Sequence, residues 1–552
     1  MRLFFPPMSF VMPFLLAMVV TIALLPVFGR VASQWRIVDV PGSRKVHTVP
    51  IPRIGGVAMA LGVFAAAFMV VRLEPPDRYF LMAAGVLTLF GALDDRFDLD
   101  YRVKLVGQLI AVAIVVFAGD VQIHSLTLED RIGLPGWLAV PLTVFFLVGI
   151  TNAINLADGL DGLAGGTTFL CLCALAMLAY SVGQLSCTAL ALAFAGAVLG
   201  FLRFNTFPAT IFMGDSGSQL LGFTVGVLSI RATQTGNNLV SAATPVLLLA
   251  LPILDTLSVM VQRISEGRSP FSPDRNHIHH KLLQLGFDHH EAVMVIYAVQ
   301  AALFVLAYWM RYESDVLILG VVSAFFLVSI TLLQTAARRK WRLRSLRQSR
   351  AESPLTRLIM RLREPRRLPR WSYLAIAGGA LVYALLVVTT ETGGLSGDVR
   401  LLLIALLGVS IVWFVFLRGK PLSTVEKSAI YITAAVLVYL DSTITHNRPV
   451  LAVAIWAAIL TMAAGTVLRL RLSNDRRFEL TPLDLIVLFV ALVIPSLPGN
   501  FGLPNGGAVG IAKLVILFYA IEALVSRSEM QVVWLRIAAA ALMAGLIVRP
   551  LL

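Results

Sequence analysis

Apolar runs of roughly 16 to 23 residues recur along the whole chain, each long enough to cross a bilayer or nearly so. The pattern predicts an all-α, polytopic membrane protein with about 18 transmembrane helices, about 11 in the first part and about 7 in the second. The first group is expected at 7–29, 54–72, 78–93, 103–118, 135–154, 163–182, 186–202, 212–230, 242–261, 291–310 and 314–335. The second is expected at 372–390, 399–417, 428–441, 449–468, 482–497, 508–525 and 532–548.

The composition agrees with this pattern. The chain has 552 residues, of which 58% are hydrophobic and only 14% are charged, whereas a soluble protein carries about 25% charged residues. The first run has no convincing small-residue cleavage site, so we expect a retained helix and not a cleaved signal. The three cysteines lie in or near apolar runs and predict no disulfide framework or zinc site.

Basic residues indicate how the helices are oriented. The net charge is +14, and Lys and Arg gather in loops that alternate along the chain, as they do on the cytoplasmic side of membrane proteins. These loops are 30–53, 94–102, 151–162, 203–211, 262–290 and 336–371. We therefore expect no nucleic-acid partner and place these loops on the cytoplasmic face.

The strongly basic stretch 336–371 divides the chain. It predicts a cytoplasmic linker beside anionic lipid, between a membrane-embedded core at 1–335 and a second multi-helix membrane region at 372–552.

Polar and ionisable residues are concentrated at 155–166, between the apolar runs 138–150 and 169–180. Ionisable groups at the edge of a membrane are costly and usually functional. The stretch contains two carboxylates, one amide and four glycines: Asp158, Asp161, Asn155, Gly159, Gly162, Gly165 and Gly166. An amide three residues before a carboxylate is oxygen chemistry that suits Mg²⁺, and the alternative is glycine-rich helix packing.

Two more clusters precede it in the chain. Arg44, Lys45 and the neighbouring His47 and Arg53 lie beside a glycine pair and suit a phosphate group, although an ordinary basic loop is the alternative. The motif D-D-R-F-D at 94–98 places carboxylates at a helix end, where they can hold Mg²⁺ or accept a proton, or form a solvated turn.

Two further clusters follow it. Asp215 stands at a predicted helix start between two glycines, where it can bind a metal or simply cap the helix. In the segment 268–280 the histidines His277, His279 and His280 lie among arginines, which favours an anion site over zinc, with a solvated loop as the alternative. We expect His289 and His290 to be surface residues.

No P-loop and no G-x-S-x-G motif occurs in the sequence, so neither a P-loop ATPase nor a serine hydrolase of that type is indicated. Carboxylates, an amide, arginines and histidines on one membrane face favour Mg²⁺-assisted phosphoryl transfer between a soluble diphosphate compound and a lipid phosphate.

Four motifs, in order, resemble the polyprenyl-phosphate N-acetylhexosamine-1-phosphate transferases, and the form N-H-I-H-H resembles their WecA-like branch. The resemblance covers about residues 10–335 and rests on D-D-R-F-D, N-A-I-N-L-A-D-G-L-D-G-L, F-M-G-D-S-G-S and N-H-I-H-H. The second membrane region lies outside this pattern.

The resemblance implies a role for each matching residue. The metal ligands would be Asn155 and Asp215, and the catalytic residues would be Asp94, Asp95, Lys104, Asp158 and Asp161. The substrate-binding residues would be Arg44, Lys45, Asn152, Arg203, Arg268, Arg275, His277, His279 and His280. The cofactor would be Mg²⁺, with Mn²⁺ as an alternative.

The implied reaction transfers N-acetylhexosamine 1-phosphate, first N-acetylglucosamine 1-phosphate, from a UDP-sugar to undecaprenyl phosphate with release of UMP. Another donor, such as a UDP-linked N-acetylfucosamine, is the alternative. The enzyme would lie in the bacterial inner membrane, contact membrane lipid and start O-antigen or other cell-envelope polysaccharide synthesis. A homodimer is left open.

Two other function classes compete. A transporter or flippase would also have many helices, but its binding site would lie near the membrane midplane, not at one surface. A non-enzymatic assembly scaffold would carry the carboxylates without using them.

Overall fold

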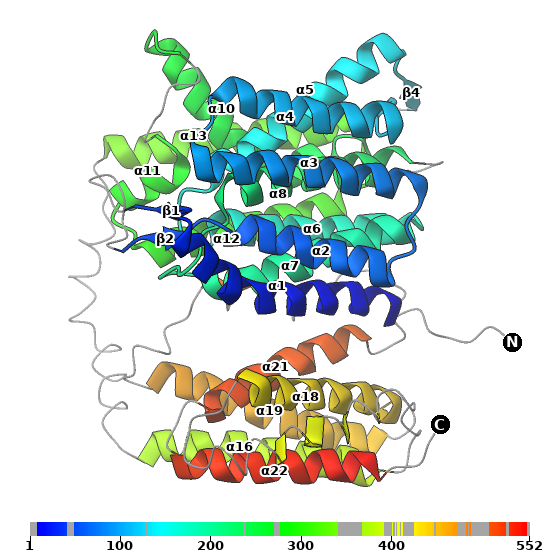
Figure 1. Cartoon of the computed structure of the whole chain (residues 1–552), viewed down its shortest axis with the longest axis vertical. Helices are drawn as coiled ribbons and strands as arrows, with labels where there is room; N and C mark the ends of the chain where they lie inside the picture. Colours follow the sequence, from blue (N-terminus) through cyan, green and yellow to red (C-terminus); the bar gives the residue numbers. More distant parts are fainter. Residues whose placement is uncertain are drawn as a thin grey trace, which may run out of the picture. The chain divides into compact units, whose positions relative to one another are not determined.

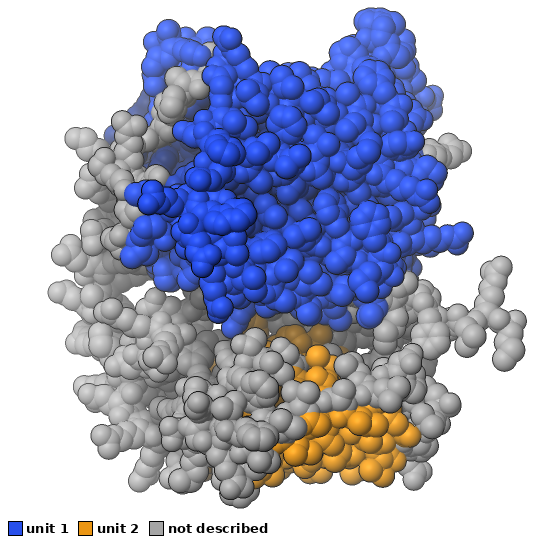
Figure 2. All heavy atoms as spheres, in the orientation of Figure 1, with its two compact units in different colours: residues 1–348, 481–486 blue, residues 349–480, 487–552 orange. Residues whose placement is uncertain are grey.

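The computed structural model describes residues 8–40, 49–128, 130–235, 239–269, 276–339, 367–390, 424–445, 449–472, 507–525 and 529–548, with scattered residues in 400–411 and 482–489. Figure 2 shows its two compact units, residues 1–348 with 481–486 and residues 349–480 with 487–552. The division falls inside the segment 336–371 that the sequence predicts to be a linker.

The first unit is a helical bundle with two short hairpins (Figure 1). Its first elements are α1 Met8–Gln34, β1 Val38–Asp39, β2 Ile51–Pro52, α2 Gly55–Val70, α3 Pro75–Phe97, α4 Tyr101–Ala113, the π-helical turn η1 Ile114–Ala118, β3 Ser125–Thr127 and β4 Arg131–Gly133. The remaining ones are α5 Gly136–Ala157, α6 Leu163–Ser181, α7 Leu185–Asn205, α8 Gly214–Gln234, α9 Thr244–Leu248, α10 Ala250–Ser265, α11 Ile278–Gln284, α12 His289–Trp309 and α13 Asp315–Arg338.

The all-α polytopic class is confirmed. Eight helices among the described residues are long and apolar enough to cross a membrane. The total of about 18 helices stays a prediction, because several expected spans fall outside the described residues.

The core of this unit is built from helices that are apolar all round. Nearly every residue of α6 is buried, as expected for a helix without a polar face. The helix α8 packs against α3 and α5, and α7 packs against α1 and α6. The hairpin β1–β2 and the short helix α11 lie at one end of the bundle, and β4 lies at the other (Figure 1). Helix ends that are far apart in sequence therefore meet at the end that carries α11.

The expected helix 242–261 is in fact two helices, α9 and α10. Pro252 has no N–H to donate to the carbonyl oxygen of Leu248, and its ring crowds that carbonyl. The Leu248 oxygen instead accepts a hydrogen bond from Gln300 Nε2 at 2.9 Å. The loop expected at 262–290 also contains a helix, α11.

A buried ion pair marks the opposite end of the bundle. Arg231, near the end of α8, pairs with Asp77 in the first turn of α3. Asp77 and Asp94 lie 17 residues apart on α3, which is about 25 Å at 1.5 Å per residue. This pair is therefore separated from the acidic motifs by most of the membrane thickness.

The second unit contains α16 Arg367–Thr389, α18 Thr424–Thr445, α19 Pro449–Leu472, α21 Gly507–Val525 and α22 Glu529–Ile547. Two ion pairs are buried inside it. Lys513 Nζ lies 2.6 Å from Asp441 and over the ring of Trp456, and Arg536 holds Glu426 with two hydrogen bonds.

We expect Lys513→Met to destabilise the second unit by about 3–5 kcal/mol, since it leaves the Asp441 carboxylate buried without its cation. The measurement is thermal unfolding of the purified protein in detergent. The double variant Lys513→Met with Asp441→Leu should recover much of the loss. If Lys513→Met and the unchanged protein unfold at the same temperature, the ion pair does not contribute to the stability of the second unit.

Candidate active site

The first turn of α8 lies unusually close to α2 and α3. A Cβ atom on Gly56 would lie 2.1 Å from the backbone nitrogen of Gly217, and one on Gly91 would lie 2.4 Å from Cα of Ser216. Both positions therefore need glycine, because a side chain would collide with backbone atoms. This packing brings Asp215, at the start of α8, next to the acidic end of α3.

Asp95 holds the start of α8 in place. Its Oδ1 accepts the backbone N–H of Asp215 at 2.8 Å, and its Oδ2 accepts the N–H and hydroxyl of Ser216 at 3.1 and 2.8 Å. The first N–H groups of a helix have no intrahelical partner, so a carboxylate from another helix caps them here. Both oxygens of Asp95 accept hydrogen bonds from the start of α8, so the residue positions Asp215, and its catalytic role stays a prediction.

We expect Asp95→Asn to lower the free energy of unfolding by about 1–3 kcal/mol, because one of the capping oxygens becomes an NH₂ group that faces N–H donors. The displaced Asp215 should also lower the transfer rate. Thermal unfolding and the rate of the phosphoryl transfer that the sequence predicts measure the two effects. Asp98→Asn is the control, since Asp98 is exposed at the end of the same motif; equal effects of both changes would contradict the capping role.

Lys104 joins the two ends of the acidic cluster. Its Nζ lies 2.6 Å from Asp94 Oδ2 and 3.0 Å from Asp215 Oδ2. The other oxygen of Asp94 accepts the backbone N–H of Leu99 at 2.8 Å. Residues from the end of α3 and the starts of α4 and α8 thus converge, as the sequence predicts.

Asn155 brings the end of α5 to the same point. Its Nδ2 donates to Ser218 Oγ at 2.7 Å and lies 3.3 Å from Asp215 Oδ1. Asn152, one turn earlier, exchanges hydrogen bonds with Gln108 at 2.9 and 3.3 Å. Asn152 therefore links α5 to α4 next to the acidic cluster.

Asp161 ties two loops together. Its Oδ2 accepts the backbone N–H of Ala209 at 2.9 Å, and its own N–H donates to Nε2 of His289 at 3.0 Å. Gly162, at a positive φ of 80°, donates its N–H to Asn205 at 3.0 Å. The expectation that His289 is a surface residue is therefore wrong: it is half-buried and fixes the backbone of the central motif.

The histidine segment packs directly on the central motif. A Cβ atom on Gly159 would lie 2.4 Å from both Cε1 and Nε2 of His279. Burial, followed by the neighbouring His280, lowers the pKa of His279 to about 3, so this imidazole is neutral at pH 7. It contacts Gly159 as an uncharged ring, and its role in substrate binding stays a prediction.

Gly159→Ala should lower the transfer rate by about 10- to 100-fold while the protein stays folded, because the added methyl displaces His279 and the loop beside Asp158. Gly149→Ala is the matched control: Gly149 lies in α5 with open space around its Cβ position. The measurement is the rate of the predicted phosphoryl transfer by the purified variants. Equal rates in both variants would contradict close packing of His279 on this loop.

Asp158 follows the end of α5. Desolvation by surrounding protein atoms, and then repulsion from the carboxylates of Asp215 and Asp161, raises the pKa of its carboxyl to about 7. The residue keeps solvent access, so the repulsion is the better supported cause. A carboxyl that titrates near neutrality suits proton transfer.

The remaining expected site residues are less closely tied to this cluster. Arg203 is exposed in the last turn of α7, and exposed Arg268 pairs with Glu266. His280 lies against His279, with ring centroids 4.2 Å apart. Arg44, Lys45 and Arg275 are outside the described residues. Arg53, from the same basic segment as the first two, pairs with Asp39.

Sequence reasoning missed several supporting residues. Asp255, buried in α10, contacts His277, and its presence in an apolar run was a usable signal. Tyr297 donates to the Gly162 oxygen at 2.5 Å, and Gln219 lies 3.5 Å from Asp215. Neither of these has a distinctive local pattern.

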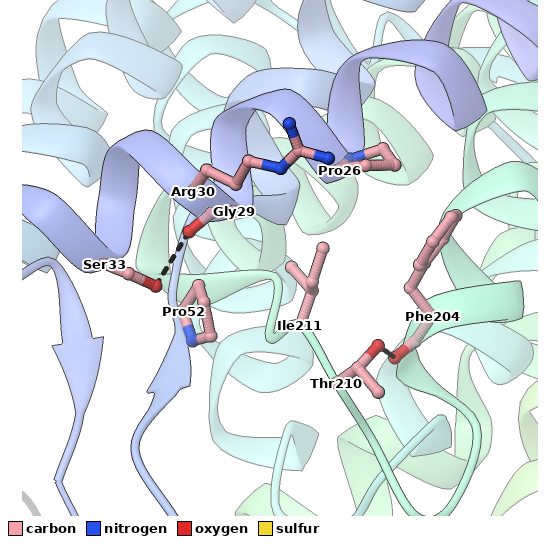
Figure 3. Close-up of a pocket in the computed structure, with 8 residues that line it drawn as sticks. All are labelled: Pro26, Gly29, Arg30, Ser33, Pro52, Phe204, Thr210 and Ile211. Atoms are coloured by element: carbon pink, nitrogen blue, oxygen red, sulfur yellow. Dashed lines mark hydrogen bonds between the residues drawn. The ribbon is translucent and has the colours of Figure 1, made fainter.

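A separate cavity of about 520 Å³ opens beside α1 (Figure 3). It is lined by Pro26, Gly29, Arg30, Ser33, Pro52, Phe204, Thr210 and Ile211. Figure 3 shows the Arg30 side chain running along α1, with Ile211 and Phe204 across from it. No aspartate of the acidic cluster is among these described lining residues.

The oxygen groups of the cluster fit Mg²⁺. Carboxylates of Asp94 and Asp215, the Asn155 amide and the Ser218 hydroxyl are hard oxygen donors. The ammonium of Lys104 lies between the two carboxylates, which shows that the position favours positive charge. Among the described residues no three His, Cys, Asp or Glu side chains are grouped to hold a metal, so the remaining ligands would be water and substrate oxygens.

Comparison with known proteins identifies relatives of the first unit. Residues 78–233 match the model of glycosyl transferase family 4. The chain is 38% identical over 292 residues to the Bacillus subtilis (strain 168) protein named "Probable undecaprenyl-phosphate N-acetylglucosaminyl 1-phosphate transferase", covering 52% of this chain and 81% of that protein.

Two further relatives have similar names. The "Undecaprenyl-phosphate alpha-N-acetylglucosaminyl 1-phosphate transferase" of Escherichia coli (strain K12) is 32% identical over 345 residues, covering 59% of this chain and 92% of the relative. The "Decaprenyl-phosphate N-acetylglucosaminephosphotransferase" of Mycobacterium leprae (strain TN) is 37% identical over 316 residues, covering 51% and 79%. The chain belongs to glycosyl transferase family 4, the polyprenyl-phosphate N-acetylhexosamine-1-phosphate transferases that its four motifs predict.

Proposed function

We propose that this protein transfers N-acetylglucosamine 1-phosphate from its UDP-linked form to undecaprenyl phosphate and releases UMP. The observation that carries the proposal is the Lys104 ammonium between Asp94 and Asp215, beside Asn155. This group of side chains suits a diphosphate substrate, because it combines a cation with oxygen atoms that can bind a metal ion. The names of the relatives support the same reaction.

In the reaction, an oxygen of the lipid phosphate attacks the sugar-bearing phosphorus of the UDP-sugar. The bond from that phosphorus to the bridging oxygen breaks, and its electron pair leaves on UMP. Lys104 supplies positive charge beside the transferred phosphoryl group. Asp158, whose pKa lies near 7, is one candidate for the proton acceptor, and Asp94 and Asp95, whose pKa values are raised to about 6 and about 7, are the others.

Bound Mg²⁺ would neutralise charge on the diphosphate. Asp94, Asn155 and Asp215 are the residues that would hold it, and Mn²⁺ is the alternative ion. The rival mechanism forms a covalent phospho-enzyme on an aspartate. A burst of UMP in the absence of lipid acceptor would favour that mechanism over direct attack.

We place the site on the cytoplasmic face, because UDP-sugars are soluble and the basic loops of the first unit lie at the end that carries the site. The product would start O-antigen or another envelope polysaccharide. The homodimer stays a prediction.

The test uses purified protein with undecaprenyl phosphate, Mg²⁺ and a panel of UDP-N-acetyl sugars, and mass spectrometry identifies the lipid product. We expect an N-acetylglucosaminyl diphospholipid, formed only without a chelator. A product with N-acetylfucosamine would change the donor and keep the reaction class. No lipid product with any sugar would leave a transporter or a scaffold as the better account.

A further inference from the structure

Asp255 clamps the start of α11 from the middle of α10. Its Oδ2 lies 2.9 Å from Nδ1 of His277, and its Oδ1 accepts the backbone N–H of Ile278 at 2.6 Å. Both Asp255 and His277 are only 6% exposed. One buried carboxylate therefore fixes an imidazole ring and the helix turn that carries it.

This contact selects one tautomer of His277. An ionised carboxylate can only accept hydrogen bonds, so the Nδ1 atom that faces Asp255 carries a proton. Nε2 is then the only ring nitrogen left for a partner outside the pair. Capping the helix requires only one oxygen of Asp255, the one that accepts the Ile278 N–H. The second oxygen accepts a hydrogen bond from the His277 ring.

The clamped ring is connected to the central motif. The rings of His277 and His279 are nearly parallel, 7° apart in plane with centroids at 5.7 Å. His279 in turn packs on Gly159, next to Asp158. The orientation set by Asp255 therefore reaches the loop beside the acidic cluster.

We propose that Asp255 is a positioning residue for sugar-phosphate transfer: it holds His277 with an unprotonated Nε2, which can accept a hydrogen bond from a hydroxyl or amide N–H of the nucleotide sugar. The inference rests on the proposed function. Asp255 itself touches His277 and the backbone, so it acts through the histidine.

Asp255→Asn tests this with little change in shape. The amide oxygen can still accept the Ile278 N–H, and its NH₂ group then faces Nδ1 of His277 and moves the ring proton to Nε2. We expect kcat to fall by about 10- to 100-fold, as for other residues that orient a functional histidine. KM for UDP-N-acetylglucosamine should change by less than about threefold, and the midpoint of thermal unfolding should stay unchanged.

A double-mutant cycle separates positioning from a general structural role. If Asp255 acts through His277, Asp255→Asn should have almost no further effect on kcat in a His277→Ala background. An equal fold-loss in both backgrounds, or an unchanged kcat in the single variant, would overturn the proposal. Leu257→Ala, at a position of α10 that is 47% exposed, is the control and should leave kcat unchanged.

A second readout does not need activity. Nitrogen NMR of ¹⁵N-histidine-labelled protein should show the Nδ1–H tautomer for His277 in the unchanged protein and the Nε2–H tautomer in Asp255→Asn. The same tautomer in both proteins would overturn the positioning role. If the unchanged protein transfers no sugar phosphate, the proposed function fails while this readout still decides the role of Asp255 toward His277.

Discussion

Asp215→Asn should reduce the release of UMP from UDP-N-acetylglucosamine by about 10³-fold or more. Asp215 contacts Lys104 and Asn155, and Asp95 fixes its backbone. Replacing the carboxylate by an amide removes a charged oxygen from the proposed metal site, where charge stabilisation is worth several kcal/mol and each 1.4 kcal/mol is tenfold in rate.

The substitution keeps the size of the side chain and the backbone N–H bonds to Asp95, so the protein should remain folded. The assay uses purified protein, undecaprenyl phosphate and Mg²⁺. Glu313→Gln is the control, since Glu313 is exposed in the turn between α12 and α13, away from the cluster. Asp215→Asn with undiminished UMP release would undo the metal role of this residue.

Lys104→Met should lower the transfer rate by about 10²- to 10³-fold, the usual effect of removing one charged group that stabilises a transition state. Lys104 is the cation that contacts both Asp94 and Asp215 among the described residues. Without it the two carboxylates repel each other, so added Mg²⁺ should raise the unfolding temperature of Lys104→Met more than that of the unchanged protein.

Arg102→Met is the matched control for this change. Arg102 lies two residues earlier in α4, is exposed, donates to the Tyr101 hydroxyl and lies over the ring of Tyr101. Its loss should leave the rate within about twofold, as for most exposed sites away from the reaction. Equal losses for Arg102→Met and Lys104→Met would mean that general basic charge, and not the bridging contact, matters.

The sequence predicts the fold class and the convergence of the acidic motifs for physical reasons. Long apolar runs leave helices as the only spanning structure, and alternating basic loops assign the motifs to one face. Asp94, Asn155 and Asp215 are indeed brought together at helix ends. The resemblance to the family then adds the reaction, which the relatives support.

Contacts between segments that are far apart in the chain could not be predicted from the sequence pattern. Nothing local distinguishes Asp94, which pairs with Lys104, from Asp95, which caps α8. The partner of His289 is a backbone N–H that lies 128 residues away. The break between α9 and α10 depends on Pro252 together with Gln300, which offers the freed carbonyl a new partner.

The most direct test of phosphoryl transfer at this site uses UDP-N-acetylglucosamine labelled with ³²P at the sugar-bearing phosphorus. The purified protein, with undecaprenyl phosphate and Mg²⁺, should move the label into the lipid fraction and release unlabelled UMP. Label that stays in soluble UDP while the sugar enters the lipid would mean transfer of the sugar alone, and would contradict the account.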